Sequence, residues 1–395
     1  MHFFHPTPLD IVDQFISAKT KGKYFDRVLD PCVGDGALLT SLENNFDSLT
    51  IIDIDSEKLK NFRDSNFIKY EGDFLDIELS EKFDLILCNP PFNNKSVSGL
   101  SIEEKFLSKC LNLINNKGYG IFILPSSIIN GTKTKKIREY LINNFTLISI
   151  DILPKKTFTK IESHFYIITL KNIKTIGNYN IDTNMGIINI NLILKHKYET
   201  LNPKYLISFS KYQTLLNYFP KVFIYKDNLF RGNVEKNNCQ LHTTHFSTLL
   251  CNKYEKFLEN KNGKKIKKYD LLCKRVGRNC HSTFSIYLGN NELVVSDCII
   301  VLPSNSKNLQ DNLIHLLNIR LSILLGASDN FMIEGSGANY ISLKKLKETD
   351  FIDFRNHISK KDIRKYAHLI LKNNVNKTIL FEETLKNKIS KKIHI

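Results

Sequence analysis

Short apolar runs bounded by polar and turn residues recur along the first 170 residues of the chain. Runs of this length predict buried strands, and they lie at 27–30, 49–55, 67–75, 83–88, 119–124, 145–153 and 164–170. Apolar residues three and four positions apart predict helices at 9–16, 101–115 and 133–144, and a further helix is expected at 37–42. Strands that alternate with helices predict an α/β fold with a mostly parallel, doubly wound sheet.

The pattern changes after residue 170. Strand-like pieces with Asn and Gly at 171–200 indicate a transition, a helix is expected at 201–218, and short strands and turns follow. We expect segments 270–278 and 293–299 to pair as β structure, and we expect a basic helical tail at 360–395 to pack against the rest. Because 395 residues suffice for about two cores, we predict an α/β domain at 1–200 and a mixed α+β domain at 201–395.

The charge of the chain is distributed unevenly between these two parts. Residues 1–170 carry 20 Lys and Arg against 22 Asp and Glu, whereas residues 171–395 carry 36 against 18. A bias of the genome toward Lys would act on both parts equally, so the asymmetry favours a second part that binds a polyanion. A solvated lysine-rich loop is the alternative for the densest basic stretch, which consists of Lys264, Lys265, Lys267, Lys268, Lys274, Arg275 and Arg278.

Composition argues against several classes of protein. No apolar run approaches the roughly 18 residues of a membrane span, and the N-terminus lacks the basic and then apolar layout of a signal peptide. The eight cysteines are scattered without a CxxC pair, which predicts neither a zinc site nor a disulfide scaffold. We therefore expect a cytoplasmic protein with no metal and no membrane partner.

The predicted strand at 83–88 is followed by the sequence Asn89-Pro90-Pro91-Phe92. Two consecutive prolines stop a strand and leave its last residues exposed at the carboxyl edge of the sheet, where open α/β sheets place their chemistry. The Asn89 side chain and the Pro90 main chain offer two carbonyl acceptors, which together can hold an exocyclic amino group by both hydrogens. The Phe92 ring could stack on the attached base, and an ordinary proline turn is the alternative interpretation.

Three earlier strands also end in residues suited to a nucleoside ligand. Gly34 and Gly36 follow the first strand and let the backbone approach a ligand closely, while the start of the next helix offers N–H groups to an anion. Asp53 ends the second strand, where a carboxylate can accept both hydroxyls of a ribose. Asp73 and Phe74 end the third and suit an adenine amino group and ring. For each acid alone, a helix cap or a solvated loop residue is the alternative.

The order of these motifs resembles the gamma-class N6-adenine DNA methyltransferases, which use S-adenosylmethionine. The resemblance covers roughly residues 3–172 and is carried by a Thr-Pro helix start, DPCVGDG at 30–36, Asp53, GDF at 72–74, NPPF at 89–92, GYGIFILPSS at 118–127 and a late Phe loop. It implies a Rossmann-like catalytic domain that binds S-adenosylmethionine and flips its target base out of the duplex.

The resemblance also implies a role for each matching residue. Cofactor contacts are implied for Thr7 at the methionine carboxylate, Asp30, Gly34 and Gly36 around the methionine part, Asp53 at the ribose, and Ile54, Asp73 and Phe74 at the adenine. Catalytic roles are implied for Asn89 and Pro90 as acceptors from the target N6, Phe92 as the ring that stacks on the flipped base, and Phe158 as a second ring that closes over it. A helix cap is the alternative for Thr7.

The second part resembles, more loosely, the target-recognition domains of Type I-like and fused restriction–modification enzymes. The expected partners are therefore double-stranded DNA, held by the basic stretch, and a cognate restriction endonuclease. RNA adenine methylation, protein-glutamine methylation and catalytically silent DNA binding are the alternatives, and cytosine N4 methylation is chemically close. A glutamine methyltransferase would not need a basic second part, whereas an RNA enzyme could use one.

Overall fold

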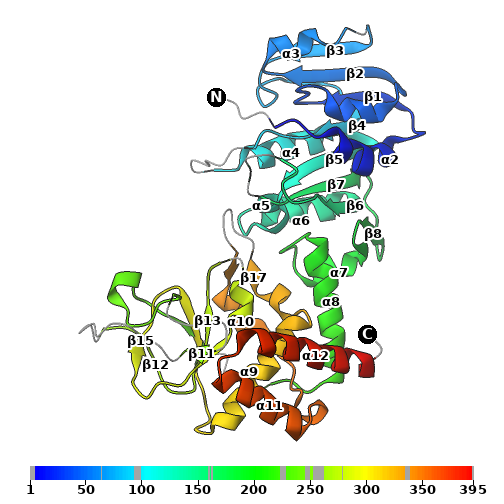
Figure 1. The fold of residues 1–395 in the computed structure, drawn as a ribbon. Coiled ribbons are helices and arrows are strands. Elements are labelled where there is room, and N and C mark those ends of the chain that lie inside the picture. The colour runs from blue at the N-terminus through cyan, green and yellow to red at the C-terminus, as the bar shows by residue number, and fades with distance from the viewer. Residues whose placement is uncertain are drawn as a thin grey trace. The chain divides into compact units, whose positions relative to one another are not determined.

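The computed structural model describes residues 5–63, 65–92, 99–158, 161, 163–222, 228–244, 250–251, 262–277, 279–333 and 339–393. The chain divides into two compact units, Met1–Ile207 and Ser208–Ile395 (Figure 1). The division falls inside helix α8 (Pro203–Tyr218), close to the boundary expected at residue 200. The different functions assigned to the two parts stay predictions.

Within the described residues, the first unit is built on a nine-stranded sheet with the order β3-β2-β1-β4-β5-β7-β6-β8-β9. Its strands are β1 (Phe25–Asp30), β2 (Phe46–Asp53), β3 (Phe67–Glu71), β4 (Phe83–Cys88), β5 (Ile114–Pro125), β6 (Thr146–Ile152), β7 (Phe165–Lys171), β8 (Asn180–Thr183) and β9 (Gly186–Asn189). Strands β1 to β5 pair in parallel, and β7 is antiparallel to both β5 and β6. The expected α/β, Rossmann-like doubly wound fold is confirmed.

Alternation along the central strands creates an apolar layer on each face of the sheet. Leu85 of β4 packs into one layer with the N-terminal helical segment 9–20, whereas the next residue, Ile86, packs into the other layer with α4 (Ile102–Leu113). Successive side chains of a strand point to opposite faces, so a strand that is covered on both faces needs a continuous apolar run. The run at 83–88 meets this requirement.

The helices of the first unit differ from the expectation at the turn after β1. They are α1 (Leu9–Ile11), the π-helical turn η1 (Val12–Ile16), α2 (Ser17–Thr20), the 3₁₀ helix η2 (Ala37–Leu42), α3 (Ser56–Lys60), α4, α5 (Ser126–Asn130), α6 (Lys135–Asn144) and α7 (Ile190–Lys195). The segment 37–42 lies between Gly36 and Glu43, which both have left-handed backbone conformations that an α-helix cannot include. A short 3₁₀ helix does not provide the α-helix N-terminus that we expected to face an anion.

The second unit combines small sheets with helices, as the expected mixed α+β fold requires. Its described strands form a five-stranded sheet, β10-β16-β13-β14-β11, and the pairs β12-β15 and β17-β18. The strands are β10 (Phe230–Arg231), β11 (Leu250–Cys251), β12 (Lys265–Ile266), β13 (Leu271–Lys274), β14 (Ser285–Tyr287), β15 (Leu293–Val294), β16 (Ile299–Leu302), β17 (Met332–Ile333) and β18 (Tyr340–Ile341). The helices are η4 (Lys236–Asn238), η5 (Cys280–Ser282), α9 (Leu309–Leu324), η6 (Ala327–Asn330), α10 (Leu343–Glu348), η7 (Arg355–His357), α11 (Lys360–Leu371) and α12 (Val375–Ile393).

The expected pairing of 270–278 with 293–299 is largely wrong. Strand β13 pairs antiparallel with β16 and β14, whereas β15 pairs with β12. The cause is a turn in which the Ile299 N–H donates to the Ser296 carbonyl at 3.1 Å. This turn divides the apolar stretch into two strands that belong to different sheets. The two expected segments meet where Lys274 lies in register with Ile299 and where the Arg275 N–H donates to the Cys298 carbonyl.

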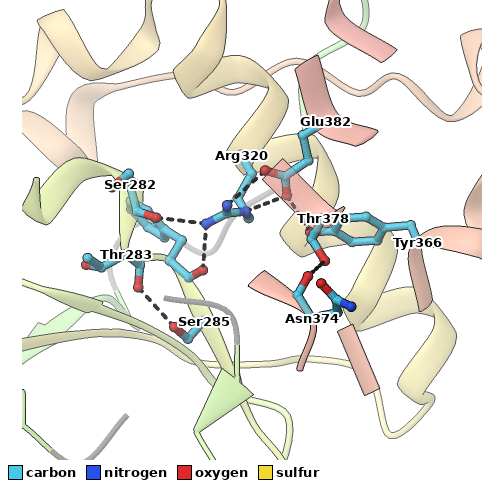
Figure 2. A network of polar contacts seen from close by, with 9 residues as sticks. Ser282, Thr283, Ser285, Arg320, Tyr366, Asn374, Thr378 and Glu382 are labelled. Atoms are coloured by element: carbon cyan, nitrogen blue, oxygen red, sulfur yellow. Dashed lines mark hydrogen bonds and ion pairs between the residues drawn. The ribbon is translucent and has the colours of Figure 1, made fainter. Parts of the chain in front are cut away.

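The helical tail packs against its own unit, as expected. Tyr366 of α11 and Phe381 of α12 are buried in the same core cluster as α9. Arg320 of α9 donates to both carboxylate oxygens of Glu382 at 2.6 and 2.8 Å, and the Tyr366 hydroxyl donates to the same carboxylate at 3.1 Å (Figure 2). Arg320 also donates to the main-chain carbonyl of Ser282 at 2.8 Å (Figure 2). A buried charged group therefore joins three helices and the turn η5.

Candidate active site

A pocket with a volume of about 200 Å³ lies where β1, β2, β3 and β4 reach their carboxyl ends. In a parallel sheet these ends share one edge, and β1 lies between β2 and β4, so residues far apart in the sequence meet there. The predicted site residues that line the pocket are Thr7, Asp30, Asp53, Ile54, Asp73, Phe74, Asn89, Pro90 and Phe92. Three further residues that were predicted for the cofactor or the target base are described but do not line it, namely Gly34, Gly36 and Phe158.

Asn89 is held at this edge through both its side chain and its main chain. Its Nδ2 donates to the Thr7 hydroxyl at 2.9 Å and to the main-chain carbonyl of His5 at 3.1 Å. Its own main-chain carbonyl accepts from the Cys32 thiol at 3.1 Å. The Asn89 Oδ1 is buried and has no hydrogen-bond partner among the described residues. Buried acceptors without a partner are rare in proteins, so this atom is suited to accept a hydrogen bond from a ligand.

Thr7 precedes the first helix without capping it. The N-cap residue of α1 is Pro8, and this helix end has no side-chain cap hydrogen bond among the described residues. The helix-cap alternative for Thr7 is therefore wrong, because its hydroxyl is directed to the Asn89 amide. The side chain lines the pocket and is only 6% exposed.

Three phenylalanine rings pack together at the Asn89 end of the pocket. The centroid of the Phe92 ring lies 4.6 Å from that of Phe165 and 5.5 Å from that of Phe158, and the Phe158 and Phe165 centroids lie 4.6 Å apart. A base stacked between Phe92 and Phe158 would need their rings about 7 Å apart. Closure of Phe158 over a base therefore requires the two rings to separate.

Asp53 connects the turn after β1 to the end of β2. Its Oδ2 accepts from the Gly34 N–H at 2.8 Å, and its Oδ1 accepts from the Asp55 N–H at 2.9 Å. Gly34 has a φ of 54°, a left-handed conformation that glycine adopts without strain. Each carboxylate oxygen keeps a further lone pair, so the side chain can still accept hydrogen bonds from ribose hydroxyls.

Gly36 has a left-handed backbone and lies close to a side chain of a later segment. Its φ is 78°, and a Cβ at this position would lie 2.7 Å from the Phe62 ring. Beside it, Asp35 pairs with Lys58 of α3 at 3.4 Å, and both residues line the pocket. This pair could not be expected from the sequence, because no motif or spacing connects the turn after β1 with α3.

Asp30 ends β1 and is buried in the wall of the pocket. Its Oδ1 accepts from the Cys32 N–H at 3.1 Å. Burial raises the pKa of the Asp30 carboxyl to about 7, and the nearby charge of Asp53 acts in the same direction. The group is thus divided between its neutral and charged forms near neutral pH. A cationic ligand group beside it would favour the charged form.

The loop after β3 carries Asp73 into the pocket. Strand β3 ends at Glu71, earlier than expected, because Gly72 has a φ of 145° and Asp73 begins a turn. In that turn the Leu75 N–H donates to Asp73 Oδ1 at 2.9 Å. On the neighbouring strand end, Ile54 lines the pocket and remains 48% exposed, which offers an apolar surface that a planar ring could cover.

The side chain of Lys109, on α4, holds the loop after β3 through hydrogen bonds to the main chain of the loop. Its Nζ donates to the main-chain carbonyls of Phe74 at 2.5 Å, Leu75 at 3.1 Å and Ile77 at 2.6 Å. The Phe74 ring is buried against Phe106, with ring centroids 5.2 Å apart. Phe74 therefore reaches the pocket as part of its wall. Lys109 could not be identified from the sequence, because a lone lysine on a helix belongs to no motif.

The residues expected to bind DNA fall into two groups in the second unit. The exposed lysines at and around β12 are Lys264, Lys265, Lys267 and Lys268. Lys267 pairs with Glu292 at 3.6 Å, and Lys268 donates to the Asn290 side chain at 2.8 Å. These ion pairs and hydrogen bonds are at the surface, so a polyanion could displace them at little energetic cost.

Lys274 ends β13, and Arg275 follows it, partly buried. The Arg275 N–H donates to the Cys298 carbonyl at 2.8 Å, and its guanidinium lies 6.0 Å from the centroid of the Tyr340 ring. The predicted residue Arg278 lies outside the described residues. The predicted basic stretch is therefore divided between an exposed lysine group and a partly buried arginine.

Comparisons with known proteins agree with this architecture. Residues 34–158 match the family described as Eco57I restriction-modification methylase. A curated tRNA1(Val) (adenine(37)-N6)-methyltransferase of Aliivibrio fischeri (strain MJ11) is 28% identical over 140 residues, which are 30% of this chain and 60% of that protein. The chain therefore spans about 60% of the length of this relative.

Two solved structures extend the comparison. The type IIG restriction endonuclease BpuSI is similar over 99% of this chain and 66% of its own, with a TM-score of 0.51 at 12% identity. A type I restriction-modification system methyltransferase subunit from Streptococcus thermophilus is similar over 50% of this chain and 58% of its own, with a TM-score of 0.43 at 14% identity. At such identities the likeness to BpuSI concerns the fold, and activity has to be argued from the site.

The family match supports a methyltransferase and includes the site from Gly34 to Phe158. Thr7 and Asp30 lie before the matched residues.

No group of three or more His, Cys, Asp or Glu side chains that could hold a metal ion occurs among the residues that the structure describes. The helices of the described ranges include none that is both long and apolar enough to cross a membrane.

Proposed function

We propose that this chain transfers a methyl group from S-adenosylmethionine to adenine N6 of a flipped base in double-stranded DNA, as part of a restriction–modification or solitary modification system. The observation that carries the proposal is the pair of acceptors after β4. Asn89 Oδ1 is buried with no partner among the described residues, and Pro90 lines the same pocket. The family match at 34–158 supports methyl transfer as the reaction.

The other residues of the pocket fit S-adenosylmethionine. Asp53 has carboxylate lone pairs for the ribose hydroxyls, Ile54 has an exposed apolar side chain for the adenine ring, and Asp73 has a carboxylate for the adenine amino group. Asp30 would face the α-ammonium group of the methionine part. When bound, this cofactor supplies a methyl group on a positively charged sulfonium.

The chain would activate a weak nucleophile by hydrogen bonding alone. Adenine N6 attacks poorly because its lone pair is delocalised into the ring. Hydrogen bonds from its two hydrogens to Asn89 Oδ1 and the Pro90 carbonyl would localise that pair on nitrogen. The bound cofactor would supply the methyl group to this nitrogen and keep the electron pair of the broken bond on its sulfur, and the methylated N6 would release one proton to water. Both acceptors are neutral, so alignment supplies the acceleration without a strong base.

The aromatic cluster would hold the target base outside the duplex. Phe92 would stack on one face of the base, and Phe158 would close over the other. This stacking would offset part of the stacking that the base loses on leaving the helix. The contact between the two rings means that Phe158 moves away from Phe92 as the base enters.

We assign DNA binding to the second unit. The exposed lysines around β12 suit phosphates, because flexible ammonium groups neutralise charge without a fixed geometry. Arg275 suits a base edge, because its main chain is hydrogen-bonded and its guanidinium lies against the Tyr340 ring. A cognate restriction endonuclease would recognise the same DNA sequence.

RNA is the second candidate substrate, and one observation favours it. The curated relative carries the name of a tRNA adenine-N6 methyltransferase. The same two acceptors would hold N6 of an adenine in RNA, and they would equally hold the amino group of cytosine. A catalytically silent DNA-binding protein would need none of these groups in place.

The test is transfer of labelled methyl from S-adenosylmethionine to unmethylated genomic DNA, total RNA and lysate protein. We expect label in DNA as N6-methyladenine. Asn89→Ala should lower kcat by about 10²–10³, the usual effect of removing a preorganised hydrogen-bonding group at the reacting atoms. The matched control is Asn116→Ala, because Asn116 is exposed on β5 and does not line the pocket.

The outcomes separate the candidates. Label in RNA alone would replace DNA by RNA as the substrate, and label as N4-methylcytosine would keep DNA and change the base. No label on any substrate, with cofactor binding intact, would favour the silent binder. Unchanged activity of Asn89→Ala would refute the role given to Asn89.

A further inference from the structure

The segment before α1 contacts the residue on which the proposed mechanism depends. Thr7 and Asn89 are 82 positions apart in the sequence, yet the Thr7 hydroxyl accepts from Asn89 Nδ2 at 2.9 Å. The main-chain carbonyl of His5 accepts from the same nitrogen at 3.1 Å. Both residues line the pocket, so these bonds lie beside the site of the reaction.

The two bonds select one orientation of the Asn89 amide. An amide NH₂ group has two hydrogens, and the two acceptors use both of them. A main-chain carbonyl can only accept, so the carbonyl of His5 excludes the flipped amide, which would place Oδ1 against it. The Thr7 hydroxyl provides the second bond and fixes the plane of the amide. Oδ1 is then left as the buried acceptor with no partner among the described residues.

The orientation matters because the expected substrate group is a donor. An amino group that meets Asn89 Oδ1 forms a hydrogen bond, whereas an amino group that meets a flipped NH₂ faces two further donors and is repelled. The two ends of a carboxamide differ little in size, so shape alone does not select between them. Selection has to come from hydrogen bonds such as those to Thr7 and His5.

We propose that Thr7 is a positioning residue for methyl transfer, whose hydroxyl, with the His5 carbonyl, directs Asn89 Oδ1 toward the substrate amino group. This inference rests on the proposed function and adds the group that orients its main acceptor. It differs from the cofactor contact that the sequence resemblance implies for Thr7. A residue that orients Asn89 acts on kcat, whereas a residue that holds the cofactor acts on cofactor affinity.

Two substitutions at position 7 separate these roles. Thr7→Val removes the hydroxyl and keeps the shape, and we expect it to lower kcat on DNA about tenfold, as the loss of one well-placed hydrogen bond would. The dissociation constant of S-adenosylmethionine should change less than about twofold, because the hydroxyl is engaged with Asn89. Thr7→Ser keeps the hydroxyl and should restore kcat. Thr384→Val, on the exposed face of α12, is the control for the exchange of Thr for Val.

A double-mutant cycle tests whether Thr7 acts through Asn89. In an Asn89→Ala background there is no amide to orient, so Thr7→Val should lower kcat no further. An additive loss would overturn the inference. So would a Thr7→Val protein that binds cofactor about tenfold more weakly at unchanged kcat, because Thr7 would then be a cofactor ligand.

A readout that needs no substrate separates failure of this inference from failure of the proposed function. The two side-chain N–H signals of ¹⁵N-labelled Asn89, identified by their loss in Asn89→Ala, report both hydrogen bonds through their exchange with water. We expect both to exchange slowly in the wild type and in Thr7→Ser, and one to exchange faster in Thr7→Val. Equal exchange in all three proteins would overturn the inference. Slow exchange in a wild type that methylates no substrate would overturn the proposed function and the positioning role of Thr7 in methyl transfer, while establishing its bond to Asn89.

Discussion

The carboxyl group of Asp30 should make cofactor binding depend on pH. Because burial raises its pKa to about 7, the group is mainly neutral at pH 6 and mainly charged at pH 8. The proposed cofactor carries positive charge on its sulfonium and α-ammonium groups, so it binds better to the charged form. We expect the affinity for S-adenosylmethionine to rise as the pH increases through 7.

The size of the effect follows from the titration. With a pKa of about 7, Asp30 is about one tenth ionised at pH 6 and about nine tenths ionised at pH 8. If only the ionised form binds, the dissociation constant falls about tenfold between these pH values. Asp30→Asn has the same shape and can still accept from the Cys32 N–H, but it does not titrate. The dissociation constant of S-adenosylmethionine from Asp30→Asn should therefore not show this tenfold change between pH 6 and pH 8.

Isothermal titration calorimetry between pH 6 and 8.5, in buffers of different ionisation enthalpy, measures both affinity and released protons. Near pH 7 the wild type should release about half a proton more than Asp30→Asn, because binding completes the ionisation of a half-charged group. The α-amino group of the ligand also titrates near pH 8, but it does so with both proteins, so the difference between them belongs to Asp30. The same pH dependence in both proteins would refute the reasoning.

Two further predictions concern stability. Gly36→Ala places a Cβ 2.7 Å from an aromatic ring at a φ of 78°, and should lower the free energy of unfolding by more than Gly22→Ala, where φ is 68° and no atom lies within 4 Å. Urea denaturation compares the two, and equal losses would contradict the steric argument. Arg320→Met leaves Glu382 buried without its counter-charge and should lower stability by about 3–5 kcal/mol. Arg355→Met breaks a more exposed pair and should cost at most about 1 kcal/mol, so similar thermal unfolding of both variants would contradict the prediction.

The central strands could be predicted because hydrophobic pattern and packing agree there. Strand β4 has the expected bounds, since an apolar run that is buried on both faces ends at two prolines. The expected strand 67–75 ends at Glu71 instead, because the backbone of Gly72 and the turn after it leave no mark in the hydrophobic pattern. In the second unit the described strands are two to four residues long, which is too short for a period to identify their partners.

The site could be predicted as far as topology determines it. The carboxyl ends of parallel strands meet at one edge, so Asp53 and Asn89 could be placed together from the sequence. Contacts between side chains and residues that are distant in the sequence could not be predicted. Lys109 reaches the carbonyl of Phe74 from 35 positions away, and Thr7 reaches Asn89 from 82 positions away. Neither contact produces a periodic pattern or a motif.

The charges of the pocket explain why an amide suits position 89. The carboxyl groups of five aspartates already line the pocket, namely Asp30, Asp35, Asp53, Asp55 and Asp73, and burial together with like charge would disfavour a further carboxylate. An amide adds no charge, and its two donors bond to the segment before α1. A carboxylate would present only acceptors to the His5 carbonyl and would lose this attachment. Asn89 therefore combines a donor group that the chain holds in place with an acceptor that is available to a ligand. A weakly nucleophilic amino group requires that combination more than it requires a base.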